Sequence, residues 1–156
     1  LTHPEEGRQL ADPRTQQLEQ RVRDGRMTVV YSGRDPMVSL SLRGVLARGE
    51  LVAFQMDRGP GDGASGIRVP CAGGEVTFAA GPALLARVCD APVVPAFFPL
   101  EGDGVRTILE PPVWAPRSAD RRRDMYELTA RLAGVYERMI RRYPDQWFTF
   151  YDFWGA

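Results

Sequence analysis

The sequence predicts an α/β fold in which a mixed sheet is flanked by helices. Short apolar runs rich in β-branched and aromatic residues alternate along the chain with segments whose apolar residues recur every three or four positions. The 16 Gly and 13 Pro residues fall mainly between these runs, where they mark turns and the ends of elements. A chain of 156 residues suits one domain or most of one.

The first half of the chain supplies a lead-in, two strands and a helix. Residues 1–26 are polar, with a short helix expected over residues 15–23. A buried strand is predicted at residues 27–31. The helix over residues 35–49 begins with an Asp that can cap it and a Pro at its first position, and it ends at a Gly. Residues 51–56 are apolar enough to form a second buried strand.

The second half, up to the last helix, is predicted to contain two antiparallel pairs. Residues 67–71 and 75–79 form a hairpin, and a helix covers residues 81–88 behind a Gly-Pro start. The apolar run 91–98 is expected to pair with residues 105–109 across a Gly-Asp-Gly turn.

The last helix is predicted over residues 118–142. A buried stripe recurs at helical spacing, formed by Met125, Leu128, Leu132, Val135 and Met139. Pro144 stops the helix, and an aromatic tail follows: Trp147, Phe148, Phe150, Tyr151, Phe153 and Trp154. Residues 117–142 carry eight Arg against four acidic residues. Arginine and aromatic residues together favour the surface of an anionic membrane, although a solvated helix face and a buried aromatic strand are the alternatives.

The composition excludes several kinds of chemistry. The formal net charge is zero, so no global field attracts nucleic acid. All 20 basic residues are Arg, which rules out Schiff-base chemistry and a Walker lysine. Cys71 and Cys89 lack metal-site spacing, and with His3 as the only histidine no zinc site is expected. No transmembrane segment or signal peptide is apparent.

Charged residues at the end of the predicted strand 51–56 are the best site candidates. Asp57 and Arg58 stand beside the Gly-rich loop Gly59–Gly66, and strand ends hold side chains steady. A surface ion pair or a turn cap is the alternative for these two residues. The loop also contains the spacing Gly-x-Gly-x-x-Gly, but it leads into a strand rather than a helix, which argues against nucleotide binding.

Four segments, in order, resemble the bacterial lipid A biosynthesis acyltransferase family. Leu46–Asp57 resembles its L-x-R-G-E-x-V-x-x-x-x-D strand, and Ile67–Gly73 resembles V-x-V-P-F-F-G. Residues 81–95 are similar to G-x-A-x-L-A followed by A-P-V-V-P, and Pro144–Phe148 resembles the closing P-E-Q-W signature. The resemblance covers residues 27–154 and implies a glycerolipid-acyltransferase-like fold, with residues 27–156 as the carboxyl-terminal portion of an incomplete domain.

The resemblance also implies a reaction. Such enzymes move a fatty acyl group from acyl carrier protein, or coenzyme A, to a membrane lipid or glycolipid, and need no cofactor. Their His-x-x-x-x-Asp motif removes the acceptor proton, but His3 has Arg8 five positions on. The catalytic His and Asp are therefore expected upstream of Leu1, and this chain alone is expected to be inactive.

The remaining expectations concern the acceptor and the location. By this resemblance Asp57, Arg58 and Arg68 bind the acceptor or its phosphate, at the cytoplasmic face of the bacterial inner membrane. The chain departs from the family pattern at Arg58, where Gln is common, and at Cys71, where an aromatic residue is common. A non-catalytic lipid- or protein-binding α/β domain derived from such an enzyme is the alternative.

Overall fold

The computed structural model describes residues 24–25, 37–56, 65–149 and 152–154. The chain divides into two compact units, Leu1–Ser41 and Leu42–Ala156. Three predictions concern residues outside the described ranges or at their margin, and they stay predictions. They are the helix over residues 15–23, the strand at residues 27–31 and the domain boundary near residue 26.

Helix α2, Met37–Ala47, confirms the helix expected in this region. Gly49 ends it with a φ of 76°, a left-handed conformation that glycine adopts at no steric cost. The amide of Glu50 then donates to the carbonyl of Val45 at 3.3 Å, which closes the last turn.

The strand predicted at residues 51–56 is wrong: this segment has no regular secondary structure. Leu51 is 84% exposed, and only Val52 and Met56 are half-buried. A strand needs a neighbour that pairs with its backbone and packs against its side chains, so β propensity alone does not form one. No described segment supplies that neighbour.

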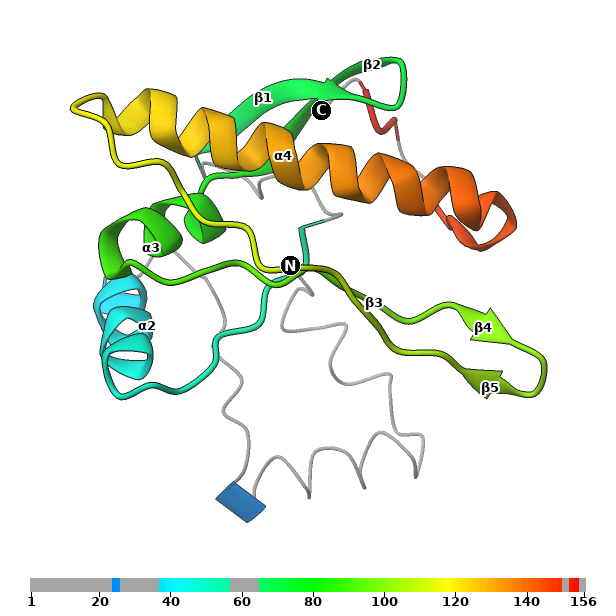
Figure 1. Cartoon of the computed structure of the whole chain (residues 1–156), viewed down its shortest axis with the longest axis horizontal. Helices are drawn as coiled ribbons and strands as arrows, with labels where there is room; N and C mark the ends of the chain where they lie inside the picture. The colour runs from blue at the N-terminus through cyan, green and yellow to red at the C-terminus, as the bar shows by residue number, and fades with distance from the viewer. Residues whose placement is uncertain (1–23, 26–36, 57–64, 150–151, 155–156) are drawn as a thin grey trace, which may run out of the picture. The chain divides into compact units, whose positions relative to one another are not determined.

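Strands β1 (Gly66–Cys71) and β2 (Gly74–Ala79) form the hairpin that the sequence predicted. Ala72 and Gly73 connect them with φ values of 51° and 84°, the geometry of a two-residue turn that matches the twist of the strands. Alternate side chains of the hairpin are buried, namely Val69, Cys71, Val76 and Phe78. This face packs on helix α4, Arg121–Arg142 (Figure 1).

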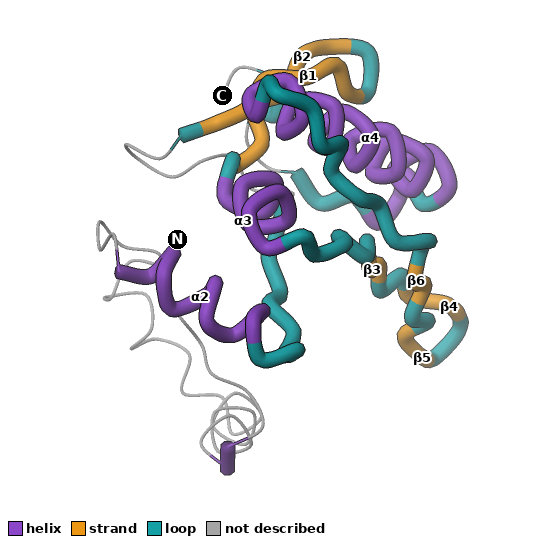
Figure 2. The backbone as a smooth tube through the Cα atoms, turned by 60° about the vertical axis from the view of Figure 1, so that its left-hand side comes forward, coloured by secondary structure: helices purple, strands orange, loops and turns teal. Residues whose placement is uncertain are grey.

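Helix α3, Gly81–Cys89, also matches its prediction and contacts the same long helix, as Figure 2 shows. Ala83 and Ala86 of α3 lie in one cluster with Leu128 and Leu132 of α4. A second cluster joins the hairpin to α4 around Ala133, with Phe153 from the end of the chain.

Residues 93–113 form a two-stranded arm built from four short strands: β3 (Ala96–Phe97), β4 (Leu100–Glu101), β5 (Gly104–Val105) and β6 (Ile108–Leu109). The antiparallel pairing predicted for this region is confirmed, but its regular strands are shorter than predicted. Pro95 and Pro99 explain the interruption. Their carbonyls accept bonds from Glu110 and Arg106, but neither proline has an N–H to return.

Helix α4 begins at Arg121, three residues later than predicted. Its N-cap is Asp120, whose side chain accepts from the amide of Arg123 at 3.1 Å. The predicted stripe is buried except at Met125, which is half-buried. A 3₁₀ turn, η3 (Pro144–Gln146), follows the helix, so Pro144 stops α4 as expected.

The α/β fold class is confirmed, since helices and sheets are both present. The described strands form three two-stranded antiparallel sheets. No described helix is both long and apolar enough to cross a bilayer.

Candidate functional site

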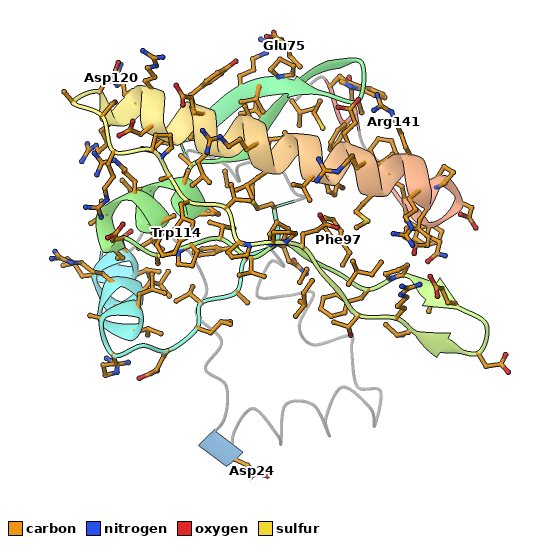
Figure 3. All side chains as sticks on the ribbon, in the orientation of Figure 1. Asp24, Glu75, Phe97, Trp114, Asp120 and Arg141 are labelled. Atoms are coloured by element: carbon orange, nitrogen blue, oxygen red, sulfur yellow. The ribbon has the colours of Figure 1, made fainter. Side chains whose placement is uncertain are left out.

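Arg68 is the one predicted site residue whose position the structure describes. It lies on β1 with its side chain on the face opposite α4, since Val69 and Cys71 on either side of Pro70 point into the core. Its Nε atom lies 3.0 Å from a carboxylate oxygen of Glu75 on β2, which Figure 3 shows at the outer side of the hairpin. Both side chains are more than half exposed, so this pair contributes little to stability and leaves Arg68 open to a ligand.

Asp57 and Arg58 lie outside the described residues, as do Gly59–Ala64 of the glycine-rich loop. The residue before them is well anchored. Met56 packs against both hydrophobic clusters, as does Ile67 of β1. The described chain thus brings the position before Asp57 close to the strand that carries Arg68, and the role of the three residues as a site stays a prediction.

A buried carboxylate at the start of α4 was not predicted. Asp124 is 1% exposed, and its Oδ2 atom accepts from Nε of Arg87 on α3 at 2.6 Å. The amide of Ser118 donates to the same carboxylate at 3.1 Å and its hydroxyl donates at 2.7 Å. Arg87 also donates to the carbonyl of Ser118 at 3.1 Å. These bonds tie α3, the segment before α4 and α4 itself together.

The environment of Asp124 favours its charged form. Burial by itself raises the pKa of this carboxyl, but the hydrogen bonds from Ser118 and Arg87 outweigh it and hold the pKa below its usual value. Both carboxylate oxygens of Asp124 accept hydrogen bonds from Arg87 or Ser118, and the side chain is buried. Asp124 therefore joins α3 to α4 through a buried ion pair.

The segment Pro144–Phe148, singled out by its resemblance to a closing signature, makes specific contacts. The side-chain amide of Gln146 accepts from the backbone N–H of Leu100 at 2.7 Å and donates to the Leu100 carbonyl at 2.9 Å. Trp147 donates from Nε1 to the Tyr136 hydroxyl at 3.2 Å. The signature thus fastens the arm to the end of α4.

The aromatic tail divides between the two alternatives that the sequence left open. Phe153 is buried, and Trp147 packs against the core cluster of the hairpin. Phe148, by contrast, is 70% exposed. Phe150 and Tyr151 lie outside the described residues. Burial in the core is confirmed for Phe153 and in part for Trp147, which is half-buried, whereas Phe148 is exposed and residues 147–149 form no strand.

The two cysteines differ in exposure: Cys71 is buried and Cys89 is half-buried. Burial raises the pKa of the Cys71 thiol to about 11, with a further rise from the charge of Glu137. Within the described residues, no group of three or more His, Cys, Asp or Glu side chains could hold a metal ion. His3 is outside these residues.

A groove runs between the second strand of the arm and the middle of α4. Its volume is about 390 Å³. Arg131, Val135 and Arg138 line it from the helix, and Glu110–Trp114 line it from the end of the arm and the residue that follows. The sequence shows Arg131 and Arg138 only as two of the many arginines of a long helix. The fold brings residues 110–114 next to them, so both arginines line one groove.

The hairpin, helices α3 and α4 and the arm are therefore parts of one α/β unit joined by specific polar contacts. A family model described as bacterial lipid A biosynthesis acyltransferase matches residues 7–155. The chain belongs to this family, as its resemblance predicted. Comparison with curated protein sequences gives no match. Membership assigns the chain to the acyltransferases of lipid A biosynthesis in general.

Proposed function

We propose that this chain is part of an enzyme that moves a fatty acyl group from acyl carrier protein, or coenzyme A, to a hydroxyl or amine of a membrane lipid or glycolipid. The family match over residues 7–155 carries the proposal. The anchoring of the family-like segment Pro144–Phe148 supports it, because Gln146 and Trp147 both have defined partners.

The proposal assigns the acceptor site to Asp57, Arg58 and Arg68. A guanidinium can bind a phosphate or carboxylate with two parallel hydrogen bonds, which suits a phosphorylated lipid. Arg68 has an exposed side chain whose ion pair with Glu75 can open at little cost. The acceptor would then reach the end of the segment 51–56, at the cytoplasmic face of the bacterial inner membrane.

The proton-abstracting group is the part of the reaction that this sequence does not contain. His-x-x-x-x-Asp is absent from residues 1–156, since Arg8 stands five positions after His3. The proposed transfer needs an imidazole to take the proton of the acceptor as its oxygen or nitrogen bonds the acyl carbon and the C–S bond of the thioester breaks. The imidazolium, stabilised by a carboxylate, then gives that proton to the departing thiolate. Both would come from polypeptide other than residues 1–156.

An acyl-transfer assay tests the proposal. The complete product of the gene and the chain 1–156 would each be mixed with labelled acyl-acyl carrier protein and a panel of lipid acceptors. We expect transfer by the complete product and none by the chain alone. A complete product that lacks both the dyad and any transfer would end the enzyme proposal.

A non-catalytic lipid-binding domain derived from such an enzyme is the second candidate. The absence of the dyad from this sequence favours it, together with the Arg-rich helix α4. It predicts binding to lipid without acyl transfer in the same assay, and so the two candidates separate cleanly.

A further inference from the structure

The groove between the arm and α4 has the chemistry of a binding site for an anionic amphiphile. Its apolar wall is made by Pro111, Pro112, Val113, Trp114 and Val135. Its charged groups are Arg131, Arg138 and Glu110, which leaves one positive charge in excess. The lining of this open groove is thus about equally polar and apolar, which suits a ligand that has both a charged and an apolar part.

The two arginines flank the groove from one face of α4. Arg131 and Arg138 are seven residues apart, which places them about 10 Å apart along the helix axis. Val135 lies between them, and it is buried. Trp114, the residue that follows the arm, also lines the groove, and 52% of its surface is exposed. The two arginines therefore line the groove from the same face of the helix.

Neither guanidinium is saturated by its carboxylate partner. Arg131 lies 3.9 Å from Glu127, which is held more closely by Arg123 at 2.9 Å. Arg138 lies 3.5 Å from Glu110 and donates its other bond, of 3.3 Å, to a backbone carbonyl. Charge-assisted hydrogen bonds of full strength are about 2.7–2.9 Å long. Both side chains are more than half exposed, so they can turn to a better acceptor.

We infer that this groove binds the phosphate headgroup of an anionic lipid, with Arg131 and Arg138 contacting the phosphate and the first carbons of the lipid lying against Pro111, Val113 and Trp114. The inference rests on the proposed function, since both concern binding of a lipid. It assigns a second lipid contact, separate from Arg68 on the hairpin. The groove would hold the domain to a bilayer that contains anionic lipid, while the acceptor reacts elsewhere.

A soluble probe tests the inference without a bilayer. Dodecyl phosphate would be titrated into the full chain below its critical micelle concentration, with the fluorescence of Trp114 as the signal and W114F to show that the signal comes from this residue. We expect saturable binding by dodecyl phosphate and much weaker binding by inorganic phosphate or by dodecyl maltoside. Equal binding of inorganic phosphate, or of the uncharged amphiphile, would overturn the inference.

A matched pair of variants locates the site. R131A/R138A removes the two groove arginines, and R121A/R122A removes two exposed arginines from the first turn of the same helix. The first variant should weaken dodecyl phosphate binding about tenfold or more, because charge-assisted bonds are lost. The second should change it less than about twofold. Equal losses would mean that the helix charge as a whole binds the probe, and the groove would be rejected.

The same variants separate this inference from the proposed function. Vesicles of phosphatidylcholine with phosphatidylglycerol would be used for sedimentation alongside the acyl-transfer assay. Groove binding with no acyl transfer by the complete gene product would reject the enzyme and keep the site. Transfer unaffected by R131A/R138A, with unchanged vesicle binding, would keep the enzyme and reject the site.

Discussion

The indole Nε1 of Trp154 donates a hydrogen bond of 3.2 Å to the carbonyl oxygen of Cys71, at the end of the first hairpin strand. The same ring covers Gly74, where an added Cβ would lie 2.1 Å from Trp154 Cδ1. Trp154 also meets Phe153 edge to face, with ring centroids 5.8 Å apart. The end of the described chain thus closes the hairpin turn, and this contact depends on a residue without a side chain.

Gly74→Ala tests that closure. The new methyl group has no room beneath the Trp154 ring, so we expect a loss of about 1–3 kcal/mol in the free energy of unfolding. Urea unfolding followed by circular dichroism measures it. Gly104→Ala is the control, because nothing lies within 4 Å of its added Cβ. If the clash is the cause, adding Trp154→Ala should recover part of the loss, and a double-mutant cycle without any coupling would contradict this explanation.

Leu128→Ala tests the packing of α4. This side chain is 0% exposed and lies between α3 and α4, so its truncation leaves a cavity and should cost about 2–5 kcal/mol. Leu109→Ala provides the comparison, because that leucine is 66% exposed on the arm and should change stability by less than about 0.5 kcal/mol. Similar unfolding midpoints for the two variants would contradict the described core.

Asp124 should make the stability depend on pH in the acid range. Its pKa is below the usual value in the folded chain, so the unfolded state binds more protons as the pH falls. The stabilisation is complete above the unfolded pKa, near 4, and is lost as the pH falls through the lower folded value.

Asp124→Asn should therefore unfold at less urea than the native chain at pH 7, and the difference should narrow below about pH 4. Asp103→Asn, in the exposed turn of the arm, controls for the loss of one negative charge and should leave the pH 7 midpoint unchanged. A gap between D124N and the native chain that widens toward low pH would show that the sign is wrong.

Gln146→Ala should loosen the arm while the core stays folded. Two hydrogen bonds to Leu100 are lost, at an exposed site, for a cost of about 1 kcal/mol. Hydrogen exchange reports it directly, since the Leu100 amide should exchange faster in the variant. The amide of Val113, which donates to the Val93 carbonyl at 2.8 Å, should keep its rate. Uniform acceleration of both amides would mean global destabilisation instead.

Cys71 should resist alkylation. With a pKa of about 11, only about one thiol in a thousand is ionised at pH 8, and the side chain is buried as well. Cys89 is partly exposed and should react first with iodoacetamide. Mass spectrometry of the timed reaction checks this order, and C89S should remove the fast phase.

The sequence predicted those parts of the fold that local chemistry decides. The hairpin β1–β2 follows from alternating apolar residues around a Gly-containing turn, and α4 follows from its repeating stripe. The strand predicted at residues 51–56 was wrong because a strand depends on a partner strand, which the composition of the segment itself does not provide. The arm was predicted as two longer strands, since the effect of Pro95 and Pro99 depends on which way their backbone groups face.

The candidate site was less accessible from the sequence. Asp124 looked like one more charged residue on an Arg-rich helix, yet it lies four and eight residues before Leu128 and Leu132, on the apolar stripe. That spacing was the available signal for a buried carboxylate. The groove carried no such signal, because residues 110–114 and the two arginines of α4 come together only through the tertiary fold.

The two hydrogen bonds between Gln146 and Leu100 bear on how the arm can contact another copy of the chain. Leu100 faces Val105 at a position where its own N–H and C=O point away from the partner strand, toward the open edge of the arm. A foreign strand could otherwise extend along that edge and recruit further copies into a growing ribbon. The glutamine amide takes the place of the next strand at this point, so the N–H and C=O of Leu100 are already bonded within the chain and are not open to a foreign strand.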